Sequence, residues 1–171
     1  MKRNRLKLLQ RSALIVVALL AAGAIVGTVA TAQPVILERF VTVPADDVTA
    51  TAILGGVLPL VRELPPGVTR GVIFVDPPGR PIGSRYVHVP YESGDRPVGR
   101  LDMRIGELGP GNGTWVDIQG ARMLVTINDT SEGYRTVNYG WEARGIAYRL
   151  GVKLVGSITR ESADRMAASV R

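Results

Sequence analysis

The chain contains no cysteine and a single histidine, His88, among 171 residues. The lack of cysteine excludes disulfides, thiolate metal sites, a cysteine nucleophile and a lipid-modified cysteine anchor. One histidine is too few for a zinc site built from several histidines. A serine–histidine–acid triad would have only His88 as its base, and no Gly-x-Ser-x-Gly turn is present to carry the serine. We therefore expect no metal, no cofactor and no enzymatic activity, and we interpret His88 as a solvated residue on a strand face.

Lysine is also scarce, and the positive charge is unevenly placed along the chain. The formal net charge is +6, from 21 Lys and Arg against 15 Asp and Glu. Five of the basic residues lie before residue 12, so 16 basic residues remain against 15 acidic ones. A nucleic-acid-binding domain needs a basic patch on its folded surface. Because the rest of the chain is nearly neutral, we expect no nucleic-acid partner. The preference for arginine over lysine is associated with GC-rich bacterial genomes.

Charged residues are missing altogether from residues 12–32, a run of 21 mostly apolar residues. A helix of this length is about 31 Å long, which matches the hydrocarbon core of a bilayer. Residues 1–11 are basic, and no acidic residue occurs before Glu38. This charge bias predicts that residues 1–11 are cytoplasmic and that the chain from Gln33 onward lies outside the cytoplasm.

Two interpretations of residues 12–32 stay open. As a retained signal anchor, the segment would hold a single-pass protein in the cell membrane and contact the lipid bilayer. As a signal peptide, it would be cleaved after Ala32, since Ala30-Thr31-Ala32 provides a small-x-small site, and the protein would be secreted. The apolar run is long for a cleaved signal, whose apolar part usually spans about 7–15 residues.

Residues 33–56 are predicted to form a stalk followed by a short helix. Asp46 or Asp47 is suited to cap the start of that helix, and Gly55-Gly56 ends it. Residues 57–171 are then predicted to form one external domain. From Gly71 the apolar residues recur with a period of two, which is typical of strands. Strands are expected at or within residues 71–76, 85–91, 100–105, 115–118, 121–127, 137–141 and 146–154.

The turns and the end of the chain complete the predicted fold, an α+β domain. Asn112-Gly113, within residues 106–113, suits the positive φ angles of a tight hairpin. Thr159 is a good N-cap for a final helix, whose apolar residues recur at helical spacing. We expect an antiparallel meander of about six to seven strands, with a short N-terminal helix and with the C-terminal helix packed on one face. Tyr139, Trp141 and Tyr148 lie among apolar positions and are assigned to the core.

The second half of the chain resembles a known type of bacterial domain. The matching residues are Leu64-Pro65-Pro66-Gly67, the strand Tyr86–Tyr91, Gly140-Trp141-Glu142, Ala147-Tyr148-Arg149-Leu150 and the terminal Met166-Ala167-Ala168-Ser169-Val170. On these residues, 57–171 resembles the uncharacterised extracytoplasmic domain at the C-terminal end of bacterial membrane-bound anti-sigma factors and of lipoproteins. The resemblance implies a sheet-plus-helix module that binds or senses and has no catalytic residues to carry over. Anti-sigma factors also need a cytoplasmic domain, often with a His and two Cys that bind zinc. Because eleven residues precede the apolar run and cysteine is absent, we expect that this chain is not a complete anti-sigma factor.

One set of polar and aromatic residues is predicted to share the outer face of the sheet. Alternation points these residues away from the core, and the mixture of Trp, Tyr, Arg and acids suits a protein interface. An ordinary solvated sheet face is the alternative. The candidate interaction surface consists of Tyr86, His88, Arg100, Asp102, Arg104, Trp115 and Asp117.

The function expected from the sequence is that of an extracytoplasmic module that binds or senses without catalysis, with a protein partner in the cell envelope as one target. Two alternatives remain. The protein would instead be an accessory subunit of a membrane complex, with Trp115 buried against another chain. Or it would be a cell-envelope enzyme that uses only carboxylates, which requires two carboxyl groups about 5–10 Å apart in a cleft.

Overall fold

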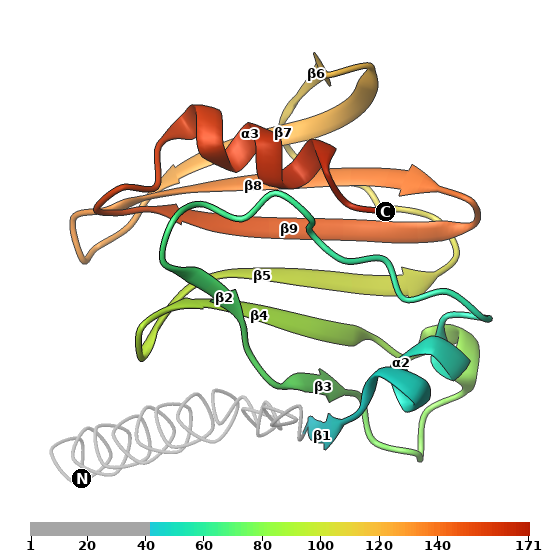
Figure 1. Ribbon diagram of the computed structural model, residues 1–171. Coiled ribbons are helices and arrows are strands. Elements are labelled where there is room, and N and C mark those ends of the chain that lie inside the picture. Colours follow the sequence, from blue (N-terminus) through green and yellow to red (C-terminus); the bar gives the residue numbers. More distant parts are fainter. Residues whose placement is uncertain (1–41) are drawn as a thin grey trace, which may run out of the picture. The chain divides into compact units, whose positions relative to one another are not determined.

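One antiparallel sheet carries most of the chain that the computed structural model describes, residues 42–171 (Figure 1). The predicted basic start and the apolar run at residues 12–32 lie outside the described residues. Among residues 42–171, none of the helices has the length and apolar character needed to cross a membrane.

The sheet has nine strands in the order β1-β3-β4-β5-β9-β8-β7-β6, and β2 pairs with β4 beside this path. Two α-helices and one 3₁₀ turn accompany it. The strands are β1 (Val43–Ala45), β2 (Val68–Arg70), β3 (Ile73–Val75), β4 (Val87–Ser93), β5 (Arg96–Ile105), β6 (Thr114–Ile118), β7 (Ala121–Asp129), β8 (Arg135–Ala143) and β9 (Ile146–Leu154). The helices are α2 (Asp47–Ile53), α3 (Arg160–Ala168) and the 3₁₀ turn η1 (Ile82–Ser84).

The α+β class agrees with the prediction, but the order of the strands differs from a simple meander. β6, β7, β8 and β9 do follow one another across the sheet, as do β3, β4 and β5. β5, however, pairs with β9, with Leu101 opposite Leu150. The hairpin predicted around Asn112-Gly113 is therefore wrong, because residues 106–113 connect two strands that do not pair. The strand count of six to seven was also too low, because β1 and β2 have three residues each and are too short to show alternation.

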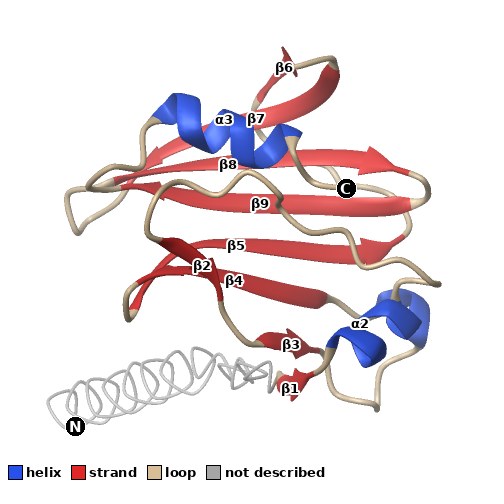
Figure 2. Ribbon diagram, in the orientation of Figure 1, coloured by secondary structure: helices blue, strands red, loops and turns tan. Residues whose placement is uncertain are grey.

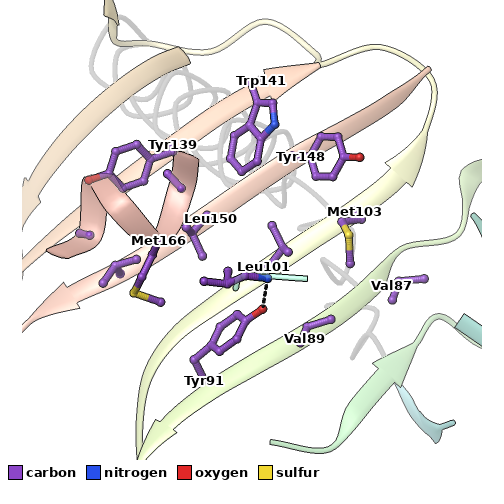
Figure 3. Close-up of a cluster of buried hydrophobic side chains, with 14 of the residues drawn as sticks. Val87, Val89, Tyr91, Leu101, Met103, Tyr139, Trp141, Tyr148, Leu150 and Met166 are labelled. Atoms are coloured by element: carbon purple, nitrogen blue, oxygen red, sulfur yellow. Dashed lines mark hydrogen bonds between the residues drawn. The ribbon is translucent and has the colours of Figure 1, made fainter. Parts of the chain in front are cut away.

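The core lies on one face of the sheet, where alternate residues of β4, β5, β9, β8 and β7 are buried (Figure 3). Leu101 and Leu150 are fully buried at the β5–β9 pairing. Tyr139, Trp141 and Tyr148 are also buried, which confirms their assignment to the core, and the rings of Trp141 and Tyr148 stack with centroids 4.9 Å apart.

α3 covers part of this face, as the spacing of its apolar residues predicted. Thr159 caps it, and Ser162 completes a reciprocal capping box with Thr159. Ala163, Met166 and Ala167 are buried, and the helix contacts β8 and β9. Its position in front of the sheet is visible in Figure 2.

The irregular segment 58–64 covers the remainder of the same face, where Figure 2 shows it as a tan coil crossing the strands. Leu60 and Arg171 exchange two backbone hydrogen bonds, at 3.0 and 3.2 Å. The Ser169 hydroxyl accepts hydrogen bonds from the backbone N–H groups of Arg62 and Glu63, at 3.1 and 3.0 Å. These bonds satisfy backbone groups of an irregular segment and tie it to the end of the chain.

α2 contributes to the same core. Asp46 caps it, with the Thr49 backbone N–H donating to Asp46 Oδ1 at 2.7 Å. Ala50 and Ile53 are buried with the sheet residues, and β1 just before the helix pairs with β3. The helix that the sequence places ahead of the domain is therefore packed into it.

Candidate functional site

The face of the sheet opposite α3, here called the open face, carries the charged and polar residues of the alternating strands. Successive residues of a strand point to opposite faces, so the residues between the buried ones of β5, β9, β8 and β7 lie on this side. The register aligns Arg100, Gly151, Asn138 and Thr126 in one row across four strands. The neighbouring row consists of Asp102, Arg149, Gly140 and Leu124.

Residues 106–113, which we call the bridging loop, cross the open face between β5 and β6. The Arg104 guanidinium donates a hydrogen bond to the Glu107 carbonyl at 2.7 Å. The Leu108 backbone N–H donates to the Glu142 carboxylate, and the Thr126 hydroxyl donates to the Asn112 carbonyl. The loop is thus fixed to β5, β8 and β7.

Gly140 lets the bridging loop approach the sheet closely. A Cβ atom at this position would lie 3.0 Å from Leu108 Cδ2, which is closer than ordinary packing allows. Gly151, in the adjacent row, is equally constrained, because its Cβ would lie 3.0 Å from Asn138 Oδ1.

The bridging loop and the open face enclose a groove of about 680 Å³. Glycines 99, 140 and 151 lie along the strands that border it. Amide and hydroxyl side chains line it on β7, β8 and the loop, and prolines and leucines form apolar patches between them. The amide and hydroxyl residues are Asn112, Thr126, Asn128, Thr136 and Asn138.

Positive charge predominates among the side chains of the groove. Three cations, Arg100, Arg149 and Lys153, line it together with one carboxylate, Asp102. That carboxylate is already engaged, because Arg100 Nε lies 2.8 Å and His88 Nδ1 lies 2.7 Å from Asp102 Oδ1. Arg149 is exposed and forms no ion pair within residues 42–171.

Five of the seven candidate surface residues come together on β5, on β4 and at the residue just before β4, beside the groove. The rings of Tyr86 and His88 stack with centroids 5.9 Å apart, and the Arg104 guanidinium lies 5.6 Å from the centre of the Tyr86 ring. Arg100 and Asp102 complete this group through the contacts given above.

His88 is not the solvated residue that the sequence suggested. Its side chain is only 17% exposed, because it lies between Asp102 and a second carboxylate, Asp76. His88 Nε2 is 3.5 Å from Asp76 Oδ1. Asp76 is 2% exposed and also accepts a hydrogen bond from the Tyr86 backbone N–H at 3.3 Å. One weak sequence signal points to Asp76, which is a charged residue directly after a continuous apolar strand.

Trp115 and Asp117 lie far from the other five residues. They are on β6, and the order of the sheet places β9, β8 and β7 between β6 and β5. At about 4.8 Å per strand, this separation is roughly 19 Å. The Arg122 guanidinium of β7 lies 5.7 Å from the centre of the Trp115 ring. The predicted surface therefore consists of two separate groups.

Within residues 42–171, no group of three or more His, Asp or Glu side chains is placed to hold a metal ion. Comparison with protein-family models, with curated proteins and with solved structures finds no match for this chain.

Proposed function

We propose that this protein is an extracytoplasmic, non-catalytic binding module of a bacterial single-pass membrane protein, or of a secreted one if the chain is cleaved after Ala32. We further propose that its groove binds an acidic polysaccharide. The location rests on the basic residues 1–11 and the apolar run 12–32. The resemblance of residues 57–171 to an extracytoplasmic sensing domain agrees with it.

The proposal of an acidic ligand depends on Arg149, which lines the groove and forms no ion pair within residues 42–171. A guanidinium binds carboxylate, sulfate or phosphate oxygens through two parallel N–H donors. Lys153 lies four residues further along β9, on the same face, so both cations line the groove from one strand. Because His88 and Arg100 already contact the one carboxylate of the groove, the exposed Arg149 is available to bind an anionic group of a ligand.

The remaining lining favours a sugar chain over a peptide or a simple anion. Asparagine and threonine side chains donate to and accept from hydroxyl groups, and they line the groove on two strands and the bridging loop. Pro90, Pro97 and Leu108 offer small apolar surfaces to the C–H faces of sugar rings. A uronic acid combines all three features: a carboxylate, hydroxyl groups and an apolar ring face.

Binding is favoured over hydrolysis at this site. A glycosidase of the common kind uses two carboxyl groups on either side of the scissile bond. The groove contributes one, Asp102, and Arg100 Nε and His88 Nδ1 already contact its Oδ1 atom. The single carboxylate supports a non-catalytic binding module over a cell-envelope enzyme that uses only carboxylates.

The proposal is tested by titrating the full-length protein, in a mild detergent, with oligogalacturonate. We expect Arg149→Gln to weaken binding about tenfold, the loss of one charge-assisted contact. Arg165→Gln on the exposed side of α3 removes the same charge and should leave the affinity unchanged. Dextran, which has no carboxylate, should not bind. The N-terminal sequence of the mature protein, beginning at Met1 or at Gln33, separates the anchored form from the secreted one.

Two results would overturn the proposal. Binding of polyglutamate with the same affinity and the same dependence on Arg149 would show an acidic-peptide site. If the folded protein bound no acidic polymer at all, the proposal that the groove binds an acidic ligand would be wrong.

A further inference from the structure

We infer that β6 is an edge through which two copies of this protein associate. In this arrangement the β6 strands of the two copies pair antiparallel about a two-fold axis at Val116 and extend the sheet across both molecules. This inference goes beyond the proposed function, because no residue of β6 lines the groove and the pairing does not require the groove to bind anything.

β6 is the last strand of the sheet and pairs only with β7 (Figure 1). Its other edge presents backbone N–H and C=O groups that no strand of residues 42–171 uses. Proteins usually protect such edges with proline, lysine, bulges or very short strands. The strand at the other end, β1, has three residues and contains Pro44. β6 has five residues and contains no proline or lysine, and its one charged side chain is Asp117.

Apolar side chains are exposed around this edge. Trp115 is 52% exposed, Val116 36% and, on the neighbouring strand β7, Ile127 53%. Trp115 lies on the open face, whereas Val116 and Ile127 lie on the apolar face of the sheet. This apolar face extends beyond α3, which contacts β8 and β9. Large exposed aromatic and aliphatic residues next to an open backbone edge are typical of a docking strand.

The pairing register follows from the faces of β6. Opposite residues of an antiparallel pair point to the same face, so a two-fold axis must pass through one residue. With the axis at Val116, the two copies of Val116 face each other on the apolar side, flanked by Thr114 and Ile118 of the two strands. On the open face, Trp115 of each copy lies beside Asp117 of the other.

Charge complementarity favours a second copy as the occupant. Arg122 stacks over Trp115, and neither Arg122 nor Asp117 forms an ion pair within the described residues 42–171. The two-fold pairing places Asp117 of one copy next to the Trp115 ring that carries Arg122 of the other. Two equivalent ion pairs form across the axis, as expected for an isologous interface.

The interface is small, so the association should be weak. A single shared strand buries less than the roughly 1,200 Å² of a standard stable interface. A covalent trap is therefore the right measurement, and the absence of native cysteine provides a clean background. Opposite Cα atoms of an antiparallel pair are about 4.5–5.5 Å apart, within the range of a disulfide.

The experiment is mild oxidation of full-length Val116→Cys in detergent and in native membranes. We expect a disulfide-linked dimer to form at least about tenfold faster than with Val72→Cys, whose native side chain is 60% exposed elsewhere on the domain. Asp117→Arg and Arg122→Asp, each added to Val116→Cys, should slow the cross-linking about fivefold. The double reversal, which restores opposite charges, should recover it.

Equal rates for Val116→Cys and Val72→Cys would overturn the inference, and so would trapping of a different protein in place of a second copy. Failure of the double reversal to recover the rate would overturn the register at Val116. Because oligogalacturonate binding is measured separately on variants of β9, a negative result here leaves the groove proposal untouched.

Discussion

His88 joins three parts of the sheet through its two ring nitrogens. It lies on β4, contacts Asp102 on β5 at 2.7 Å and lies 3.5 Å from Asp76, which follows β3. Asp76 is almost completely buried. A buried carboxylate is tolerated only when hydrogen bonds and opposite charges compensate for the water it has lost. His88 therefore has a structural part in the surface that the sequence singled out.

We predict that His88→Ala lowers the free energy of unfolding by about 1–3 kcal/mol, the usual contribution of hydrogen bonds to charged groups. The substitution removes the contact with Asp102 and one contact of the buried Asp76, which keeps the Tyr86 N–H and Arg80 as partners. Urea denaturation of the purified fragment 42–171 measures it. Arg135→Ala is the control, because Arg135 and Asp129 form an ion pair that is exposed on both sides and should contribute less than about 1 kcal/mol. A loss for His88→Ala no larger than that of the control would contradict the structural part assigned to His88.

The sequence predicted that His88 and Asp102 share a face, because alternation along β4 and β5 decides it. It could not predict Asp76 as the second partner. Asp76 belongs to no regular pattern, and the loop and 3₁₀ turn between residues 77 and 86 bring it back beside β4. Similarly, alternation assigned Trp115 to the same face as Arg100 but could not give the distance between them.

At the level of whole elements, local signals predicted α3 and most strands, whereas strand neighbours were beyond their reach. The N-cap Thr159 and the spacing of Ala163 and Met166 are properties of a few consecutive residues. The pairing of β5 with β9 depends instead on contacts between residues far apart in the sequence, such as Leu101 and Leu150, which are 49 positions apart. Alternation fixes which face a side chain takes, not which strand lies beside it.

The attachment of α3 to β8 depends on a buried tyrosine. The Tyr139 hydroxyl donates to Asp164 Oδ1 at 2.7 Å, and Arg160 Nε donates to the same oxygen at 2.8 Å. Burial, with the hydrogen bond to Asp164, raises the pKa of Tyr139 well above its ordinary value of 10.0. Above pH 10 the unfolded chain releases this proton while the folded protein keeps it, so stability is complete below pH 10 and falls as the pH rises beyond it.

We predict that Tyr139→Phe lowers stability at neutral pH by about 1 kcal/mol, the net value of one hydrogen bond. It should also make the fall in stability above pH 10 shallower, by up to about 1.4 kcal/mol per pH unit. The fall should not vanish, because burial also raises the pKa of Tyr91 and of Tyr148. Urea denaturation of the fragment at several pH values measures both effects, and an unchanged alkaline slope would contradict the prediction.

Over the whole described chain, two locally connected groups of strands share a single core. One group is β3–β4–β5, the other is β6–β7–β8–β9, and the pairing of β5 with β9 joins them. Leu101 and Leu150 face each other across this junction, and both are fully buried. Because the core continues across the junction, neither group can unfold without exposing apolar surface of the other.

We therefore predict that residues 42–171 unfold in one cooperative transition, with the same midpoint by tryptophan fluorescence and by circular dichroism. Trp141 reports on the second group, whereas circular dichroism reports on the entire sheet.

Leu101→Ala in the first group should cost about 2–5 kcal/mol and should lower both midpoints together. Combined with Leu150→Ala, it should show a coupling energy of about 0.5–3 kcal/mol, because the two residues are in contact. Ile127→Ala, at an exposed position of β7, should change stability by less than about 0.5 kcal/mol. If Leu101→Ala lowered the circular dichroism midpoint but left the Trp141 signal in place, the two groups would be independent units and the junction would contribute little to the fold.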